Sequence, residues 1–415
     1  MTLPTTVNHH NSSSLSTSRN RRLLILINPF SGSGKAPNKF KKKVQPILQE
    51  AGITHQVITT NYKNGAQDLI KDLTDIYHWD GIVVVSGDGL LFEVFNGLML
   101  RDDWQKAIQI PVGIIPAGSG NGLAATLDFK TSSNDTPDPI TSGALNAVFG
   151  KPCPVDLVEV SLPRQKLYSF LSVGWGLISD IDIESEGLRF IGDSRFVLWS
   201  IYRSFVPKTY RGRLSYLPVD NKTLTNLKKH GSDTIEIEVK QTGDNNETNS
   251  SKRHEEPSND THNDSGNVGE NDDACSSPSP NQNDYIPPLW EAVPSNWTTI
   301  EDDFIMVQSA SQSHLSPTVH FAPHSELADG IIWLAYITSK VSIKNLLRFL
   351  SSLESARHTD LPYVKIIPVR AFRLEPLTSG GTLSIDGEAF DPQPCQVQIL
   401  PSMGKIFIRD ADQIS

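Results

Sequence analysis

The sequence predicts an N-terminal doubly wound, Rossmann-like α/β domain followed by a C-terminal antiparallel β-sandwich domain. Three apolar runs of strand length in the first third of the chain each end in a glycine-rich turn and then change to helical spacing. Beyond residue 150 the pattern changes to many short alternating runs separated by turn residues, which is typical of a sandwich. The 415 residues are enough for two domains with sizeable cores.

The first apolar run, from Leu23 to Asn28, enters a turn that holds Pro29, Ser31, Gly32, Ser33 and Gly34. A P-loop requires glycine where this chain has Pro29, and Ser or Thr where it has Ala36. The dinucleotide pattern G-x-G-x-x-G fails as well, because Pro37 stands at the third glycine position. Neither of these two familiar nucleotide motifs therefore describes the turn.

The second run, from Gly81 to Val85, is β-branched from residue 82 onward, as expected of a strand that is buried on both faces. It ends in Ser86, Gly87, Asp88 and Gly89, after which apolar residues recur at helical spacing. A glycine turn at a helix N-terminus exposes N–H groups that suit a phosphate. A purely structural turn does not need a charge at Asp88, so we expect an enzyme that brings a nucleotide phosphate to a hydroxyl.

The third run, from Pro111 to Ile115, enters the turn Gly118, Ser119, Gly120 and Asn121. Parallel strands present their carboxyl ends at one edge of an open sheet, and ligands bind at that edge. A single glycine turn is a weak signal because such turns end many strands for steric reasons. Three of them at one edge predict a phosphate cradle.

The second half of the chain contains ten predicted short strands and two predicted helices. The strands are Val155 to Val160, Leu167 to Val173, Arg213 to Leu217, Thr234 to Lys240, Phe304 to Gln308, Thr318 to Phe321, Ile331 to Tyr336, Val364 to Phe372, Leu383 to Asp386 and Gln396 to Ile399. The helices run from about Phe190 to Phe205 and from about Ile343 to Arg357.

Charge and composition single out two polar segments. Fourteen acidic and two basic residues lie between 241 and 303, whereas the whole chain has a net charge of −10, so the remainder is close to neutral. We expect a disordered acidic insertion at about 241–297 and a disordered tail at 1–20, because neither can bury enough apolar surface to offset its ordering entropy. The three cysteines favour a reducing compartment, and with no signal peptide or membrane-spanning run the sequence predicts a cytoplasmic protein.

Four acidic residues alternate between 180 and 186. On a strand, Asp180, Asp182, Glu184 and Glu186 would lie on one face, where their like charges repel unless a cation neutralises them. One interpretation is a solvated edge strand backed by arginines. The other is a site for an ammonium group beside an apolar pocket.

Several of these motifs occur together in one known family. The segments SGDGLLFEVFNGL, PAGSGN, WGLISDIDIESEGLRFIGDSRF, RGRLSYLP and the late DGE resemble sphingosine kinases, within the wider diacylglycerol kinase superfamily. The resemblance extends from about Leu23 to Ile408, apart from the insertion. The chain has SGDGL where the wider superfamily usually has GGDGT, and it has Phe92 where animal sphingosine kinases commonly have histidine.

The resemblance implies transfer of the γ-phosphate of ATP to the primary hydroxyl of sphingosine or a related long-chain base, giving sphingosine 1-phosphate, with the active site in the interdomain cleft. It assigns residues 21–150 to the nucleotide and 151–415 to the lipid. Asp88 would be catalytic, and Glu388 would help to hold Mg²⁺. The ATP-binding positions it implies are Asn28, Pro29, Ser31, Gly32, Ser33, Gly34, Thr60, Ser86, Gly87, Gly89, Glu93, Gly118, Ser119, Gly120, Asn121, Arg189, Arg195, Asp386, Gly387 and Glu388. The substrate-binding positions are Asp182, Ser172, Ile178, Ile181, Phe196, Leu346, Phe349, Leu350 and His358.

Two alternatives stay open at this point. One is a kinase of the same superfamily that acts on ceramide, diacylglycerol or NAD, none of which needs a carboxylate at Asp182. The other is a non-catalytic lipid-binding module, which we disfavour because Asp88 and Glu388 are both present. A lipid substrate also predicts reversible peripheral membrane contact, to which the basic run Lys39, Lys41, Lys42 and Lys43 would contribute unless it is only a solvated face. We expect no nucleic acid partner, and the sequence does not decide between a monomer and a homodimer.

Overall fold

The computed structural model describes residues 21–131, 138–185, 187–188, 194–220, 222–223, 225 and 286–409. Four predicted features lie outside these residues: the tail, the strand from Thr234 to Lys240, the start of the helix from Phe190 and the insertion up to residue 285.

Residues 286–297, the end of the predicted insertion, are described and are held against the sandwich. Arg373 donates to the carbonyl oxygens of Pro288 (2.9 Å) and Glu291, and Gln396 donates to that of Pro287 (2.6 Å). The composition of residues 286–297 does not reveal this anchoring, because their backbone carbonyl oxygens and not their side chains accept the hydrogen bonds.

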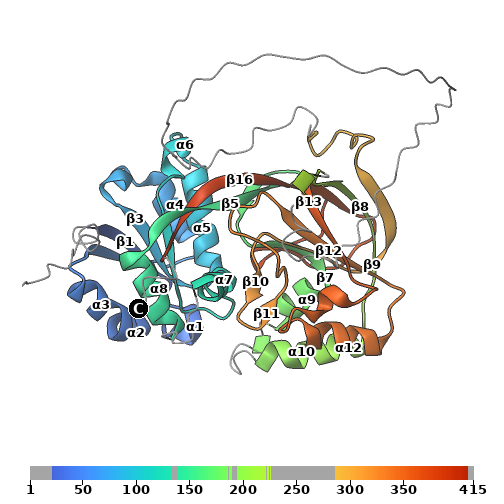
Figure 1. The fold of residues 1–415 in the computed structure, drawn as a ribbon, viewed down its shortest axis with the longest axis horizontal. Helices are drawn as coiled ribbons and strands as arrows, with labels where there is room; N and C mark the ends of the chain where they lie inside the picture. The colour runs from blue at the N-terminus through green and yellow to red at the C-terminus, as the bar shows by residue number, and fades with distance from the viewer. Residues whose placement is uncertain are drawn as a thin grey trace, which may run out of the picture. The chain divides into compact units, whose positions relative to one another are not determined.

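The N-terminal part is a parallel sheet of four strands in the order β2-β1-β3-β4, with helices on both sides (Figure 1). The strands are β1 (Arg22–Ile27), β2 (Thr54–Thr59), β3 (Gly81–Ser86) and β4 (Val112–Pro116). The helices are α1 (Ser31–Gly34), α2 (Ala36–Lys39), a π-helical segment (Phe40–Val44), α3 (Gln45–Glu50), α4 (Gly65–Asp72), a 3₁₀ turn (Ile76–His78), α5 (Asp88–Met99), α6 (Trp104–Ala107), α7 (Gly122–Thr131) and α8 (Pro139–Phe149).

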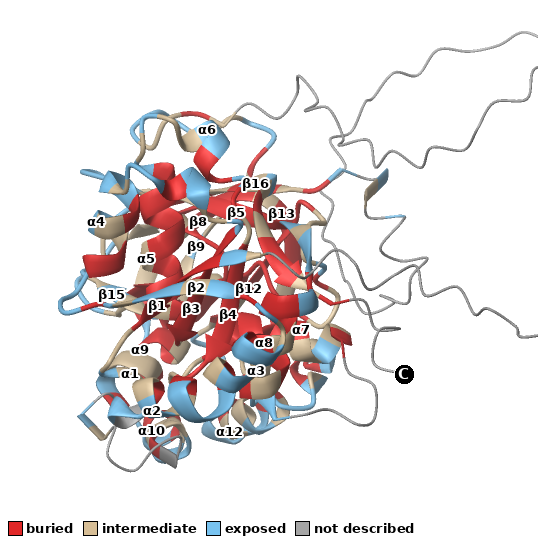
Figure 2. Cartoon of the chain, turned by 90° about the vertical axis from the view of Figure 1, so that its left-hand side faces the viewer, coloured by how far each residue is buried: buried red, intermediate tan, exposed pale blue. Residues whose placement is uncertain are grey.

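Alternation along β1 shows why this sheet is covered on both faces. Leu24 and Leu26 belong to a core that includes side chains of α4 and α5, whereas Leu23 and Ile25 belong to a second core with side chains of α2, α3 and α8. Successive strand residues point to opposite faces, so an apolar run buries both. Figure 2 shows the buried strands behind helices whose outer faces are exposed. The predicted doubly wound α/β domain is confirmed.

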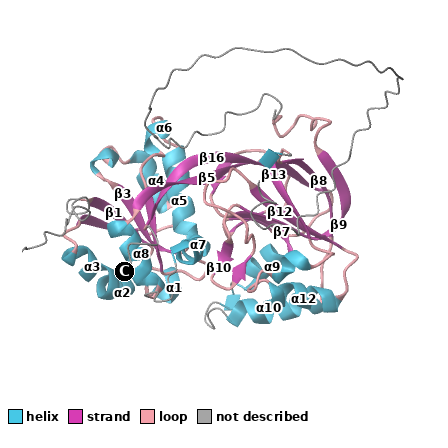
Figure 3. Cartoon of the chain, viewed as in Figure 1, coloured by secondary structure: helices cyan, strands magenta, loops and turns pink. Residues whose placement is uncertain are grey.

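The C-terminal part consists mainly of antiparallel strands (Figure 3). The strands are β5 (Lys151–Ser161), β6 (Lys166–Ser169), β7 (Ser172–Gly176), β8 (Tyr210–Pro218), β9 (Thr298–Ala310), β10 (His314–Ser316), β11 (Val319–His320), β12 (Ile332–Thr338), β13 (Lys365–Pro376), β14 (Leu383–Ile385), β15 (Glu388–Phe390) and β16 (Cys395–Ile408). The helical segments are α9 (Leu177–Glu184), α10 (Ser194–Phe205), α12 (Ile343–Ser352) and a 3₁₀ turn (Arg357–Asp360). The predicted antiparallel β-sandwich is confirmed.

The last strand joins the two parts of the fold. β16 pairs antiparallel with β5 and β13, and at Ile406 it pairs parallel with Val112 of β4. One continuous sheet therefore runs from β15 to β2. The last strand, β16, therefore lies next to β4 in the same sheet as the N-terminal strands.

The structure corrects three predicted elements. The alternating acidic segment is the helix α9 and not a strand, with Leu177 and Ile181 buried four residues apart on one helical face. The strand predicted from Leu167 to Val173 is split into β6 and β7, because the N–H groups of residues 170–172 bond to the Asp386 carboxylate. The helix predicted to reach Arg357 ends at Ser352, and Ala356 beyond it has a left-handed φ of 58°.

Candidate active site

The three predicted glycine turns converge at one edge of the parallel sheet. A methyl group on Gly118 would lie 2.5 Å from the Cα atom of Gly87 and 3.3 Å from the Ser31 hydroxyl. Such a separation is far shorter than a van der Waals contact, so only glycine allows these turns to pack together. The turns after β1, β3 and β4 therefore meet, as their strand positions predicted.

Asp88 is the first residue of α5 and lies where these turns meet. Its side chain is 7% exposed, and it accepts hydrogen bonds from the backbone N–H groups of Gly122 (2.7 Å) and Leu123 (3.4 Å) at the start of α7. Burial raises the pKa of Asp88 to about 6, although these hydrogen bonds oppose the shift. A carboxylate with that pKa is a better proton acceptor than an ordinary aspartate and is still ionised at neutral pH.

The start of α7 is itself held in place by Asn121. This residue has a left-handed φ of 62°, and its side chain accepts a hydrogen bond from Gly118 N (3.2 Å) and donates one to Gly118 O (2.9 Å). A methyl group on the intervening Gly120 would lie 3.1 Å from an Asp88 carboxylate oxygen. The third turn therefore both orients the carboxylate and leaves space beside it.

Other predicted nucleotide residues surround the same edge. Asn28 follows β1 and accepts a hydrogen bond from Phe30 N (2.9 Å), and Thr60 follows β2 and is buried. The Glu93 carboxylate accepts hydrogen bonds from Asn64 N and Ala66 N, so it holds the start of α4, and burial raises its pKa. Ser86 is buried at the end of β3, Ser119 is exposed, and the side chain of Ser33 lies outside the described residues.

The late Asp-Gly-Glu segment forms a tight hairpin between β14 and β15. Ile385 pairs with Glu388 across a two-residue turn, in which Asp386 and Gly387 have left-handed φ values of 49° and 84°. The buried Asp386 carboxylate accepts four hydrogen bonds, one from the Ser169 hydroxyl and three from the N–H groups of residues 170–172. Burial raises the pKa of Asp386 to about 6. Its carboxylate therefore faces protein, and only the turn and Glu388 remain available to a ligand.

Glu388 connects this hairpin to the catalytic turn. A methyl group on Gly89 would lie 3.2 Å from one Glu388 oxygen, and the other oxygen lies 2.7 Å from Lys63 Nζ. Sequence reasoning did not identify Lys63, which lies in the loop after β2. That strand was also missed, because its polar and half-exposed residues lack the apolar run of the other three strands.

The acidic residues of α9 have separate tasks. Asp180 and Glu184 are four residues apart, and both form ion pairs with Arg203 (3.1 and 2.5 Å). Asp180 also accepts hydrogen bonds from the Tyr210 hydroxyl (2.6 Å) and from Thr382 N (2.9 Å). Asp182 pairs with a different arginine, Arg195. Glu186 and Arg189 lie outside the described residues.

Asp182 lies beside the hairpin turn instead. One of its carboxylate oxygens would be 3.7 Å from a methyl group on Gly387, and the other lies 3.6 Å from Arg195, whose guanidinium stacks on the Phe196 ring. Asp182 is 38% exposed, whereas the side chain of Asp180 is 4% exposed. Ser172, at the start of β7, donates its N–H group to Asp386 below the same turn (2.8 Å). A continuous set of neighbours therefore leads from Asp182 through the hairpin to Asp88.

The predicted tail-binding residues come from three helices and one turn. Helix α10 packs against both α9 and α12. Ile181, Leu346, Phe349 and His358 are buried, and Ile178, Phe196 and Leu350 are half-buried. These positions thus lie on elements that pack against one another, α10 against α9 and α12, and α12 against the 3₁₀ turn (Arg357–Asp360).

Two further features bear on chemistry. Within the described ranges, no three His, Cys, Asp or Glu side chains form a group that could hold a metal ion by themselves. No helix in these ranges is long and apolar enough to cross a bilayer.

Comparison with protein families gives two matches. Residues 22–159 match the diacylglycerol kinase catalytic domain, and residues 296–408 match the YegS C-terminal NAD kinase β-sandwich-like domain. Among solved structures, a diacylglycerol kinase from Bacillus anthracis str. Sterne superimposes with a TM-score of 0.55 at 15% identity and covers 94% of this chain and 98% of its own. At that identity the likeness shows the fold alone.

Closer sequence relatives cover both domains. Human sphingosine kinase 1 is 36% identical over 391 residues, covering 92% of this chain and 89% of the relative. Human sphingosine kinase 2 is 33% identical, covering 93% of this chain and 71% of the relative. Sphingoid long chain base kinase 4 of Schizosaccharomyces pombe is 27% identical, covering 93% and 74%.

Proposed function

This chain belongs to the sphingosine kinase family, and we propose that it transfers the γ-phosphoryl group of ATP to the primary hydroxyl of sphingosine or a related long-chain base. The product would be sphingosine 1-phosphate or its analogue. In this proposal residues 21–150 bind the nucleotide and residues 151–415 bind the lipid. The observation that carries it is the set of neighbours that joins Asp182, the hairpin and Asp88.

In the transfer step, the acceptor oxygen forms a bond to the γ-phosphorus while the bond from that phosphorus to the bridging oxygen breaks. ADP keeps the electron pair of the broken bond, and the hydroxyl proton passes to the Asp88 carboxylate. Phosphoryl transfer depends mainly on positioning and charge stabilisation, so Asp88 orients the hydroxyl first and takes its proton late. The raised pKa of Asp88 assists the second task.

The glycine turns would hold the phosphates with their backbone N–H groups, and the Ser119 hydroxyl is exposed beside them. Arg195 and Arg189 would neutralise the triphosphate, because guanidinium groups match phosphate oxygens. Glu388 suits Mg²⁺, because this cation commonly takes one or two carboxylates together with phosphate and water oxygens. When bound, Mg²⁺ would neutralise charge on the phosphates.

On the lipid side, Asp182 would bind the protonated amine of the base. Asp182 is 38% exposed and lies beside the hairpin turn, whereas Asp180 is buried in its ion pair with Arg203. The apolar tail would pack among the predicted tail-binding residues of α9, α10 and α12, where each buried CH₂ contributes about 0.8 kcal/mol.

An acceptor assay tests this proposal. Radiolabelled ATP is offered with sphingosine, ceramide or diacylglycerol, to the wild type and to Asp182→Asn. We expect transfer to sphingosine and, in the variant, a KM for sphingosine raised about tenfold or more with the KM for ATP unchanged, as for a lost charged hydrogen bond. If Asp182→Asn raised the KM for ceramide or diacylglycerol by the same factor, a neutral lipid would be favoured as the substrate. Asp103→Asn, an exposed substitution in an ion pair with Arg101, is the control for a general charge effect.

We also propose that the protein is cytoplasmic and meets membranes peripherally. The three cysteines of the chain are few and odd in number, which favours a reducing compartment. One face of α10 and the residue after it expose apolar side chains at helical spacing, each 46–62% exposed: Val197, Leu198, Ile201, Tyr202, Phe205 and Val206. An exposed apolar face beside the lipid site suits the bilayer in which the substrate dissolves.

Vesicle sedimentation tests the membrane proposal. Ile201→Glu should reduce binding to anionic vesicles, whereas Leu377→Glu, at another exposed apolar position, should not. If binding also weakens with salt, the exposed lysines Lys41, Lys42 and Lys43 are the next candidates. Equal binding by both variants would exclude the α10 face.

A further inference from the structure

Two histidine rings stack at the point where the sandwich meets helix α7. His314 of β10 and His320 of β11 are cross-strand partners, and their rings are 4.1 Å apart and 7° from parallel. Phe129 of α7 packs against both, with ring centroids 5.2 and 5.0 Å away. The stack therefore joins the short hairpin to the helix through aromatic contacts.

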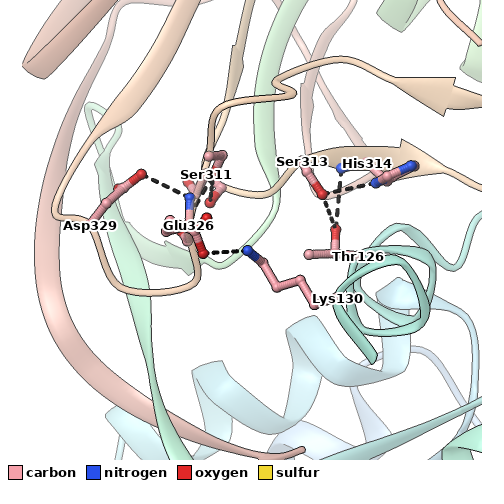
Figure 4. Close-up of polar contacts among 8 residues, drawn as sticks. Thr126, Lys130, Ser311, Ser313, His314, Glu326 and Asp329 are labelled. Carbon is pink, nitrogen blue, oxygen red and sulfur yellow. Dashed lines mark hydrogen bonds and ion pairs between the residues drawn. The ribbon is translucent and has the colours of Figure 1, made fainter. Parts of the chain in front are cut away.

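Polar contacts fix the same junction. Figure 4 shows Thr126 of α7 facing Ser313 and His314, and its hydroxyl oxygen accepts hydrogen bonds from His314 N (3.2 Å) and the Ser313 hydroxyl (3.4 Å). Ser313 also bonds to His314 Nδ1 (2.8 Å). A methyl group on Gly122 would lie 2.8 Å from the carbonyl oxygens of His314 and Leu315. The backbone of the β10–β11 hairpin is thus packed directly against Gly122, the first residue of α7.

That first residue matters because Gly122 and Leu123 donate the N–H groups that hold the Asp88 carboxylate. The helix is consequently held at one end by the catalytic carboxylate and along its side by the histidine hairpin. A displacement of the hairpin would move both donors. Misplacing a reacting group by about 1 Å can cost about a hundredfold in rate.

We propose that the stacked rings of His314 and His320 position α7, and through it Asp88, only while both rings are uncharged. The chain would then carry a device that turns the kinase off in acid, separately from protonation of Asp88. The proposal rests on the proposed role of Asp88. Two imidazolium rings at this separation would repel each other inside a pocket that also disfavours a single charge.

The groups around the stack do not offset such a charge. His324 and His358 lie close enough to influence His320 and to be influenced by it, and like charges there would add repulsion. Lys130 on α7 is paired with Glu326, and Asp360 acts on His358. Burial lowers the pKa of His314 to about 4 and also lowers that of His320. His314 is therefore neutral at pH 7 and becomes charged as the pH falls toward 4, and the lowered pKa of His320 favours its neutral form in the same way.

The pH dependence of kcat/KM tests the device. As the pH falls toward 4, the wild type should lose activity with a slope steeper than the about tenfold per pH unit that one protonation of Asp88 gives. The double variant His314→Phe/His320→Phe keeps an aromatic stack and removes both titrating rings, so its slope should fall to that single-proton value. His78→Gln, at an exposed histidine outside the cluster, should match the wild type.

Hydrogen exchange gives a readout that does not depend on activity. At pH 4 the amides of residues 121–131 should lose protection about tenfold relative to pH 7 in the wild type, but not in His314→Phe/His320→Phe. Thr126→Val, a change of similar shape, should lower kcat about tenfold at all pH values and leave the KM for ATP unchanged.

Two results would overturn the proposal. One is a single-proton slope shared by the wild type, His314→Phe/His320→Phe and His78→Gln. The other is α7 exchange that is equally protected at both pH values in the wild type. Absence of any transfer to a long-chain base would count against the proposed function instead, and the exchange measurement would still decide whether the stack is pH-sensitive.

Discussion

Asp88 and Asp386 are two carboxylates in similar surroundings with different tasks. Each follows a short strand, each is next to glycine in a tight turn, and burial raises the pKa of each to about 6. They differ in which part of the fold their donors hold. Asp386 accepts four hydrogen bonds that hold the β6–β7 connection, whereas the N–H groups of Gly122 and Leu123 that bond to Asp88 belong to the start of α7.

This difference separates a structural carboxylate from a reactive one. A carboxylate offers about four lone-pair positions, so four donors leave Asp386 little capacity for a ligand. Asp88 instead lies at the edge where the three glycine turns meet. A raised pKa alone therefore does not identify a catalytic group, and the position of the carboxylate at this edge does.

The largest effect should come from Asp88→Asn, which removes the proton acceptor but keeps the shape of the side chain. We expect kcat to fall by about 10³-fold or more, because a positioned general base contributes about 10²–10⁴-fold. ATP binding and the melting temperature should change little. If this variant turned over at the wild-type rate, Asp88 would be as structural as Asp386.

Asp386→Ala should act on stability instead. Removing the carboxylate leaves the N–H groups of residues 170–172 without their buried partner, and one unsatisfied buried donor costs about 1–3 kcal/mol. We expect the free energy of unfolding in urea to fall by about 3 kcal/mol or more. At a temperature where the variant is still folded, kcat should be close to that of the wild type, and a selective loss of kcat would contradict the comparison.

The pH dependence sharpens the contrast further. Phosphorylation needs ionised Asp88, so kcat/KM should fall at least about tenfold per pH unit below pH 6, and Asp386→Asn should keep this acid limb. Stability behaves differently: a folded-state pKa above the unfolded value means that the native state holds more protons between about pH 4 and 6. The free energy of unfolding should therefore decrease across this window as pH rises, and Asp386→Asn should reduce the decrease. Titration of urea unfolding checks the sign.

The smallest effects should come from the neighbouring glycines. Gly120→Ala places a methyl group 3.1 Å from an Asp88 oxygen, where the acceptor hydroxyl would lie, so kcat should drop several-fold with little loss of stability. Gly387→Ala forces a φ of 84° on alanine, which costs about 1 kcal/mol of stability. Measuring kcat and the melting temperature of both variants checks this. If both variants lost the same share of kcat and of melting temperature, the distinction between a reactive and a structural turn would be wrong.

Local motifs explain why the nucleotide edge could be predicted from the sequence. Asp88 and the turn from Gly118 to Asn121 each sit at the junction of an apolar strand and a helix, and such patterns are readable within about ten residues. The alternating acidic residues from Asp180 to Glu184 suggested a strand but belong to a helix. Their partners lie 19–30 residues away in sequence, since Arg203 donates to Glu184 and Tyr210 donates to Asp180. The contact of Lys63 with Glu388, and those of the His314–His320 hairpin with Thr126 and Phe129 of α7, are long-range, and no local pattern contains them.

The most direct test is a crystal structure with sphingosine and a non-hydrolysable ATP analogue. The account predicts the primary hydroxyl of sphingosine within hydrogen-bonding distance of the Asp88 carboxylate, on the side facing the γ-phosphorus, with the amine near Asp182. A hydroxyl that lies away from Asp88 and contacts another group, with the terminal phosphate in place at the glycine turns, would contradict it.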